Sequence, residues 1–213
     1  MKKIFLRFAL VGLVALSIAA TIQKMSNVLI MGDSISIGYT PFLQKGLLPF
    51  VNVEHIPGNG GNTKRGIERA EQWLGTKQWD VIVFNFGLHD LARIDSLKKY
   101  NVIDGKQAVS IEEYKRNLTT IVEKLKETTA TIIFANTTVV PDNAAGRKVE
   151  DVAIYNAAAQ EIMKKNGIKV IDLYTLSEKV HPENSKPGNV HYTEKGYELL
   201  AAPIIDAIKE AIK

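Results

Sequence analysis

Two residues far apart in the sequence could form a nucleophile and its base. Ser34 ends the tripeptide Gly32-Asp33-Ser34, which directly follows the apolar run NVLIM, and His191 lies in the segment Val190-His191-Tyr192-Thr193. A serine hydroxyl attacks a carbonyl carbon when a neighbouring base accepts its proton, and histidine is the most common base near neutral pH. Each motif alone is also typical of a turn that caps a helix. The pair therefore predicts acyl-group chemistry only if the fold brings the two side chains together.

Two further segments contain groups that could stabilise a negatively charged intermediate. The glycines of Gly58-Asn59-Gly60-Gly61-Asn62-Thr63 allow a backbone N–H to approach a ligand closely. In Gly87-Leu88-His89-Asp90, the His89 ring could donate a hydrogen bond to an oxyanion. The alternatives are a flexible loop for the first segment and, for the second, a histidine that only braces its loop through Asp90. Neither segment matches the phosphate-binding or dinucleotide-binding glycine motifs.

Short apolar runs alternate with helical patterns along the chain. The predicted strands are 27–31, 51–56, 81–86, 131–136 and 168–173, and the predicted helices are 42–48, 64–74, 110–128, 150–165 and 193–213. This alternation predicts an α/β fold, a three-layer sandwich with a central parallel sheet of about five strands. Ligands bind beyond the carboxyl ends of the strands in such sheets, so we expect the four motifs to meet at one rim.

In this order, the four motifs resemble the conserved blocks of the SGNH (GDSL-type) hydrolase family. The resemblance covers nearly all of the chain after residue 20 and implies a flavodoxin-like SGNH hydrolase fold, a serine esterase activity, and no metal or organic cofactor. It implies that Ser34 is the nucleophile and His191 the base. It also implies an oxyanion hole formed by the backbone N–H groups of Ser34 and Gly61 together with the side chain of His89.

Two positions depart from the family's pattern. His89 stands where the family has asparagine, and its ring N–H can still donate, so we expect it to keep the oxyanion contact. Gly188 stands three residues before His191, where the family has the aspartate that orients the base. The amide oxygen of Asn189, a backbone carbonyl or the carboxylate of Glu183 could replace it, and the sequence does not choose among them.

The remaining charged residues have simpler interpretations. We interpret Asp33 and Asp90 as structural residues that hydrogen-bond to nearby backbone. Arg93 and Arg147 lie in loops and could reach an anionic substrate, although surface charge is the simpler interpretation. No second histidine lies at ligand spacing from His55 or His181, so we expect no metal site. Trp73 and Trp79 are expected to pack on the side opposite the active rim.

Residues 1–20 have the pattern of a signal peptide. Lys2, Lys3 and Arg7 precede an uncharged, mostly apolar run that ends in small residues. We therefore expect export to the periplasm or the medium, with 21–213 as a single SGNH hydrolase domain. The run is short for a membrane span, which is the alternative. The chain has 27 basic and 23 acidic residues, and three basic residues lie in this leader. The remaining 24 basic against 23 acidic residues give no reason to expect nucleic acid as a partner.

The sequence thus predicts an exported esterase whose substrate is a small-molecule or glycan ester, with an O-acetyl group on a carbohydrate as one candidate. A lipid or lysophospholipid ester is the alternative substrate. A binding protein on the same scaffold and a flavodoxin-like cofactor binder are alternatives of another class. The 213-residue chain contains no cysteine, which excludes disulfides and a lipoprotein leader. Oligomeric state, acyl length and alcohol partner do not follow from the sequence.

Overall fold

A parallel sheet lies at the centre of the protein. The computed structural model describes residues 25–213, so the predicted signal peptide lies outside the described residues. The sheet contains β1 (Ser26–Met31), β2 (Val51–His55), β3 (Val81–Phe84), β6 (Thr131–Ala135) and β7 (Lys169–Ile171). Its strand order is β2-β1-β3-β6-β7, and every neighbouring pair is parallel. The predicted five-stranded parallel sheet is confirmed.

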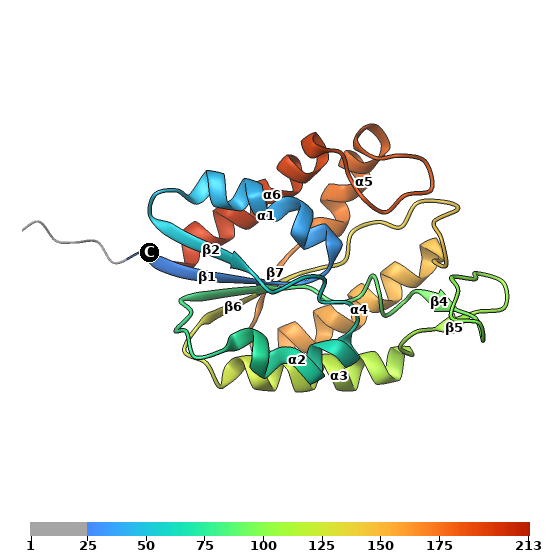
Figure 1. Ribbon diagram of the computed structural model, residues 1–213, viewed down its shortest axis with the longest axis horizontal. Coiled ribbons are helices and arrows are strands. Elements are labelled where there is room, and N and C mark those ends of the chain that lie inside the picture. The colour runs from blue at the N-terminus through green and yellow to red at the C-terminus, as the bar shows by residue number, and fades with distance from the viewer. Residues whose placement is uncertain (1–24) are drawn as a thin grey trace, which may run out of the picture.

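Helices cover both faces of this sheet (Figure 1). One layer contains α1 (Ser34–Leu47), α5 (Leu173–Asn184) and α6 (Glu194–Ala211), and the other contains α2 (Thr63–Leu74), α3 (Ile111–Lys126) and α4 (Val149–Asn166). The predicted three-layer α/β sandwich is therefore confirmed. Crossovers between parallel strands are right-handed, so the connecting helix changes face only where the chain reverses its direction across the sheet. The chain moves from β1 outward to β2 and then back past β1 to β3, so α1 and α2 lie on opposite faces.

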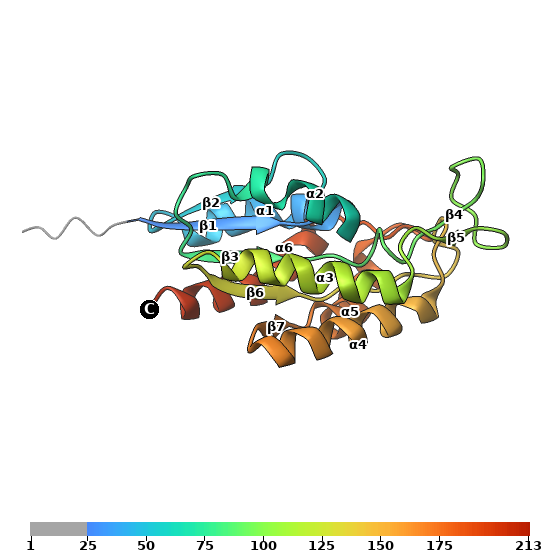
Figure 2. The ribbon, with the colours of Figure 1, turned by 90° about the horizontal axis from the view of Figure 1, so that it is seen from below.

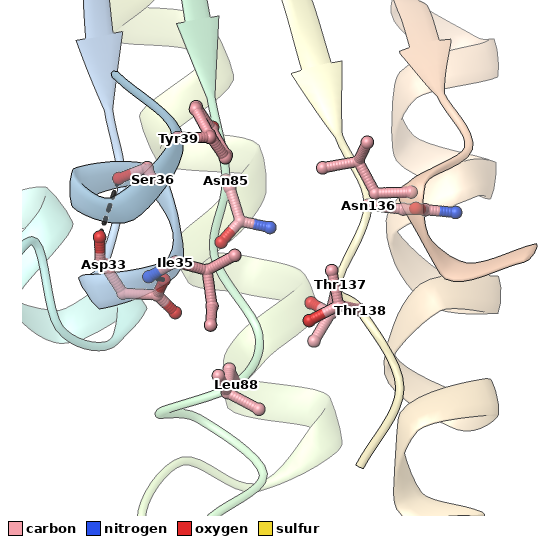
Figure 3. Close-up of a pocket in the computed structure, with 10 residues that line it drawn as sticks. Asp33, Ile35, Ser36, Tyr39, Asn85, Leu88, Asn136, Thr137 and Thr138 are labelled. Atoms are coloured by element: carbon pink, nitrogen blue, oxygen red, sulfur yellow. Dashed lines mark hydrogen bonds between the residues drawn. The ribbon is translucent and has the colours of Figure 1, made fainter. Parts of the chain in front are cut away.

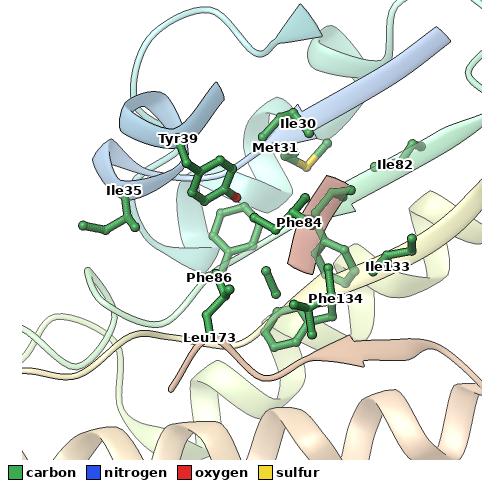
Figure 4. Packing of buried hydrophobic residues seen from close by; sticks show 14 of the residues in the cluster. Ile30, Met31, Ile35, Tyr39, Ile82, Phe84, Phe86, Ile133, Phe134 and Leu173 are labelled. Atoms are coloured by element: carbon green, nitrogen blue, oxygen red, sulfur yellow. The ribbon is translucent and has the colours of Figure 1, made fainter. Parts of the chain in front are cut away.

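The core is built from the continuous apolar runs of the central strands. Ile30, Phe84 and Phe134 are each no more than 1 % exposed, because helices cover these strands on both sides. The rings of Phe84 and Phe134 meet edge to face with their centroids 5.0 Å apart (Figure 4). Full burial of such a side chain stabilises the fold by about 1.5–3 kcal/mol. Trp73 and Trp79 are also buried, as expected for packing residues.

Local capping explains where several helices begin. Ser110 accepts a hydrogen bond from the backbone of Glu113 at the start of α3, and Thr193 accepts one from Gly196 at the start of α6. Such caps satisfy N–H groups that have no partner within the helix. At the end of α4, Gly167 adopts a left-handed conformation with φ +67, which closes the helix.

Three elements differ from the sequence prediction. Helix α1 begins at Ser34 rather than at residue 42, so the serine lies in its first turn. The segment Leu173–Asn184 forms α5, a helix that is absent from the prediction. A small hairpin of β4 (Arg93–Ile94) and β5 (Lys106–Gln107) projects beyond the sheet on the side where the strands end (Figure 2). Among the described residues, no helix is long and apolar enough to cross a membrane.

Candidate active site

Ser34 stands at the point where β1 meets α1. Asp33 caps the helix, and its Oδ1 accepts a hydrogen bond from the backbone of Ile35 at 2.9 Å. The backbone N–H of Ser34 has no acceptor among the described residues, as expected for the first residue of a helix. The positive end of the helix dipole lies at the same place. This turn therefore offers a hydroxyl and an unpaired N–H donor side by side.

The structure places His191 beside Ser34, although 157 positions separate them in the sequence. The Oγ of Ser34 lies 2.8 Å from Nε2 of His191. The other ring nitrogen, Nδ1, lies 2.9 Å from Oδ1 of Asn189. The same Oδ1 accepts the backbone N–H of His191 at 3.0 Å, which identifies it as the oxygen of the amide. Nδ1 must therefore carry the ring proton, and the lone pair of Nε2 faces the hydroxyl of Ser34.

The loop before His191 explains why aspartate is missing three residues earlier. Gly188 has φ +67, a left-handed conformation that favours glycine, and a Cβ there would lie 3.3 Å from the carbonyl oxygen of Asn143. Glu183 is exposed, and no hydrogen bond joins it to His191. Of the side-chain candidates for an orienting group, Asn189 is the one that contacts the ring.

His181 holds this loop in place, which the sequence does not predict. Its Nε2 lies 2.7 Å from the carbonyl oxygen of Asn189, and its Nδ1 lies 3.0 Å from Oγ of Ser185. The side chain is buried, and its ring packs edge-on against Tyr192 with centroids 5.2 Å apart. The sequence signal was a histidine in a helical pattern eight residues before Asn189, but only the fold of α5 brings the two together.

The glycine-rich loop after β2 differs from the expectation in one respect. The backbone N–H of Gly61, an expected oxyanion donor, donates to Oδ1 of Asn59 at 2.8 Å. Gly60 donates to the carbonyl of Gly32 at 2.8 Å, and a Cβ at Gly60 would lie 2.6 Å from that oxygen, so the loop packs directly against the turn before Ser34. The donor of Gly61 therefore already has a partner.

Asp90 joins this loop to the one after β3. Its Oδ1 accepts the backbone N–H of Thr63 at 2.9 Å and the hydroxyl of Thr63 at 2.6 Å. Oδ2 is buried without a hydrogen-bond partner among the described residues. Burial raises the pKa of the Asp90 carboxyl to about 7, against the effect of the two bonds from Thr63. Asp90 thus fixes the N-terminus of α2 relative to His89.

His89 projects from the same loop into the cleft that contains Ser34 and His191. Burial lowers the pKa of its imidazole. The negative charge of Asp33 opposes this shift, and the positive charge of Arg147 adds to it. At neutral pH the ring is therefore uncharged and carries one N–H. No hydrogen bond engages either ring nitrogen among the described residues, so this N–H can be offered to a ligand.

The cleft is open and has a volume of about 570 Å³. Its wall contains both polar and apolar groups, and the lining residues are Ser34, Asn59, Leu88, His89, Tyr100, Ala145, Arg147, Pro187, Gly188, Asn189, Val190 and His191. Arg147 lies in this wall and is only 9 % exposed, so the interpretation as surface charge is wrong. Arg93 instead forms an ion pair with Asp151 at 3.0 Å.

A second cavity lies beneath the turn of Ser34, between the ends of β1, β3 and β6 (Figure 3). Its volume is about 10 Å³, which is too small for an ester substrate. Asp33, Ile35 and Leu88 lie around it, with Thr137 and Thr138 from the segment after β6. The open cleft, with its volume of about 570 Å³, has the room for an ester that this cavity lacks.

A second serine contacts a histidine nearby. Oγ of Ser36 lies 2.7 Å from Nε2 of His55, and Nδ1 of His55 lies 2.6 Å from the carbonyl of Ile56. Ser36 is only 1 % exposed, so no substrate reaches it. No group of three or more His, Cys, Asp or Glu side chains within the described part of the chain could hold a metal ion.

The fold and the order of these motifs agree with a known family. The sequence model of the GDSL-like Lipase/Acylhydrolase family matches residues 30–199. The chain belongs to this family. The members of the family act on ester bonds, so the protein is an ester hydrolase, and its fold is the SGNH hydrolase fold.

Solved structures of GDSL-type esterases are similar to this hydrolase. An acetyl xylan esterase, AlAXEase, is 18 % identical with a TM-score of 0.70, covering 85 % of this chain and 99 % of its own. A lipase/acylhydrolase from Enterococcus faecalis is 23 % identical with a TM-score of 0.68, covering 87 % and 96 %. Axe2, an acetylxylan esterase from Geobacillus stearothermophilus, is 16 % identical with a TM-score of 0.68, covering 88 % and 96 %. No curated protein sequence matches the chain significantly.

Proposed function

We propose that this GDSL-family hydrolase is a serine esterase in which Ser34 is the nucleophile and His191 the general base. The observation that carries the proposal is the hydrogen-bonded chain from Oγ of Ser34 through the ring of His191 to Oδ1 of Asn189, with distances of 2.8 Å and 2.9 Å. This chain leaves the Nε2 lone pair directed at the hydroxyl, which is the tautomer that proton abstraction requires.

The reaction proceeds through an acyl-enzyme. Oγ of Ser34 forms a bond to the ester carbonyl carbon while Nε2 of His191 takes the hydroxyl proton. The tetrahedral intermediate then breaks its bond to the alcohol oxygen, which leaves with the proton from Nε2. A water molecule attacks the acyl group and gives one proton to Nε2. When the intermediate collapses, this proton returns to Oγ, and the carboxylic acid is released.

The negative charge of each intermediate is stabilised by the backbone N–H of Ser34 and the N–H of His89, with Gly61 as the third donor. Ser34 and His89 support this assignment because both have a donor without a partner on the cleft side. Gly61 contributes once its hydrogen bond to Asn59 opens or is shared with the oxyanion. Removal of one such donor typically costs ~3–4 kcal/mol of transition-state stabilisation.

The substrate is a small acyl ester of a polar alcohol, with an O-acetyl group on a carbohydrate as the best candidate. A cleft lined by amides, an arginine and two histidines suits a polar alcohol better than the acyl chains of a lipid. The acetyl xylan esterases among the similar structures support the same substrate class. Export through the signal peptide at 1–20 would bring the enzyme to such glycans, and N-terminal sequencing of the secreted protein tests for its cleavage.

The decisive experiment combines turnover of 4-nitrophenyl acetate with labelling by a fluorophosphonate. We expect the wild-type protein to hydrolyse the ester and to carry the label on Ser34, as located by peptide mass spectrometry. Ser34→Ala should lose both. Ser36→Ala is the matched control, because Ser36 also contacts a histidine but is buried. It should keep the label on Ser34. Equal turnover by wild type and Ser34→Ala, or a label on another residue, would contradict the proposal.

A further inference from the structure

Arg147 is a buried cation in the wall of the cleft. Its side chain donates from Nε to the carbonyl of Leu88 at 2.9 Å and from Nη1 to the carbonyl of Ala145 at 3.0 Å. A guanidinium has five N–H groups, so these two bonds leave three without an acceptor among the described residues. Both N–H groups of Nη2 belong to these three.

Among the described residues, no carboxylate forms an ion pair with this charge. The ion pairs among residues 25–213 include Arg93 with Asp151 but none that involves Arg147. The ring centroid of Tyr100 lies 5.2 Å from the guanidinium carbon. An arginine that is 9 % exposed normally has an anionic partner, because removal of a charge from water is costly. Because Arg147 lines the cleft, a ligand bound in the cleft could supply the missing anionic partner.

The surroundings hold the guanidinium in one position. Gly146 has φ +66, and its carbonyl oxygen accepts a hydrogen bond from the backbone N–H of Arg93 at 2.6 Å, which fixes the loop against the β4–β5 hairpin. Tyr100 covers the loop from the hairpin side and, like Arg147, lines the cleft. The cation is thus preorganised, so binding of a ligand costs little entropy for ordering the side chain of Arg147.

We propose that Arg147 binds a carboxylate on the ester substrate, so that the enzyme prefers esters carrying a negative charge over their neutral counterparts. Planar guanidinium and carboxylate groups form paired, charge-assisted hydrogen bonds, which suits the N–H groups left on Arg147. The inference rests on the proposed esterase function and adds to it the class of substrate. An O-acylated acidic sugar is one source of such a carboxylate, on the alcohol side, and a dicarboxylic acyl group is another, on the acyl side.

Two matched pairs of esters distinguish these sources. The carboxylate lies on the alcohol in 4-acetoxybenzoate, whose neutral match is 4-acetoxybenzamide. It lies on the acyl group in mono-4-nitrophenyl adipate, whose neutral match is 4-nitrophenyl heptanoate. We expect wild type to prefer the charged member of one pair in kcat/KM, at low ionic strength. Arg147→Met should reduce this preference at least about tenfold, the size expected for loss of a charge-assisted contact.

Arg147 could affect turnover in two ways, by binding the carboxylate of the substrate or by holding the His89 loop through its hydrogen bond to Leu88. The control variants separate these two effects. Arg116→Met removes an exposed arginine from α3 and should keep the wild-type preference. Arg147→Lys retains the charge and should keep part of it. If Arg147→Met lowers turnover of charged and neutral esters equally, Arg147 only braces the loop, and the inference is overturned while the esterase proposal stands. A wild-type enzyme without preference in either pair also overturns it.

A binding measurement keeps the test independent of turnover. The products 4-hydroxybenzoate and adipate should bind to the Ser34→Ala protein in titration calorimetry, and at least one of them should bind at least about tenfold more weakly once Arg147→Met is added. Equal binding with and without Arg147 overturns the inference even if no ester is hydrolysed. Absence of turnover and of fluorophosphonate labelling in the wild type would instead contradict the proposed function.

Discussion

Replacement of Asn189 by alanine tests how the base is oriented. In the folded protein, one amide oxygen receives both the ring Nδ1–H of His191 at 2.9 Å and its backbone N–H at 3.0 Å. Asn189→Ala removes this acceptor without touching the contact between Ser34 and His191. The ring can then adopt the tautomer with the proton on Nε2, which cannot accept from serine.

The expected size of the effect follows from the neutral character of the amide. A neutral hydrogen bond contributes about 1 kcal/mol, and its strength roughly doubles when the ring becomes an imidazolium in the transition state. With a further ~1 kcal/mol for the ring's freedom to adopt the wrong tautomer, we expect a loss of about 2–3 kcal/mol. This corresponds to roughly a 30- to 150-fold lower kcat. The loss should be smaller than the ~10⁴-fold decrease known for a triad whose buried aspartate becomes asparagine.

The assay is steady-state hydrolysis of 4-nitrophenyl acetate across pH. Because the orienting bond strengthens in the transition state, kcat and kcat/KM should fall together in Asn189→Ala. Asn189→Asp should raise kcat by about tenfold or less, since a full charge near the exposed ring adds only about 1 kcal/mol. Asn52→Ala, on β2, is the control and should match wild type. An Asn189→Ala enzyme within threefold of wild type would refute this account of the base.

Three further changes have defined outcomes. In the wild-type protein, the free energy of unfolding should decrease as pH rises from about 4 to about 7. Asp90→Asn should not show this decrease. The folded carboxyl, with its pKa of about 7, binds its proton more tightly than the unfolded one near 3.8, by at most about 4 kcal/mol. Urea titrations of both proteins across this range check it, and parallel curves would contradict it. His89→Ala should lower kcat by about 10²-fold or more, whereas His89→Asn should lose less than tenfold, as measured with 4-nitrophenyl acetate. Gly188→Asp should not raise activity and should destabilise the protein by about 1–2 kcal/mol in the same titrations, because its left-handed backbone favours glycine.

The parts of the fold that follow from local patterns were predictable. The buried strands are continuous apolar runs, α3 and α6 begin at side-chain caps, and α4 ends at Gly167. Helix α5 was missed because Pro182 interrupts its pattern, although the spacing of Leu173, Leu176 and Val180 was a usable signal. The β4–β5 hairpin has strands of two residues each, which carry no periodic signal.

The site divides in the same way. The rule that ligands bind beyond the strand ends was sufficient to expect Ser34 and His191 at one rim, and Asn189 was a candidate because of its proximity in sequence. The burial of Arg147 was not predictable, because it depends on how its loop packs against the segment after β3. The bond between Asn59 and Gly61 is local, but which acceptor satisfies a loop N–H depends on the conformation of the whole turn.

The short turn from Asn189 to His191 has a mechanical consequence. Since the acceptor lies two residues from the ring it holds, base and acceptor belong to one small rigid unit rather than to two separate loops. A shift of this unit, whether by thermal motion or by an insertion elsewhere in the loop, displaces the imidazole without randomising its proton. The tautomer of His191 therefore depends on a contact inside its own turn and not on how that turn packs against the rest of the protein.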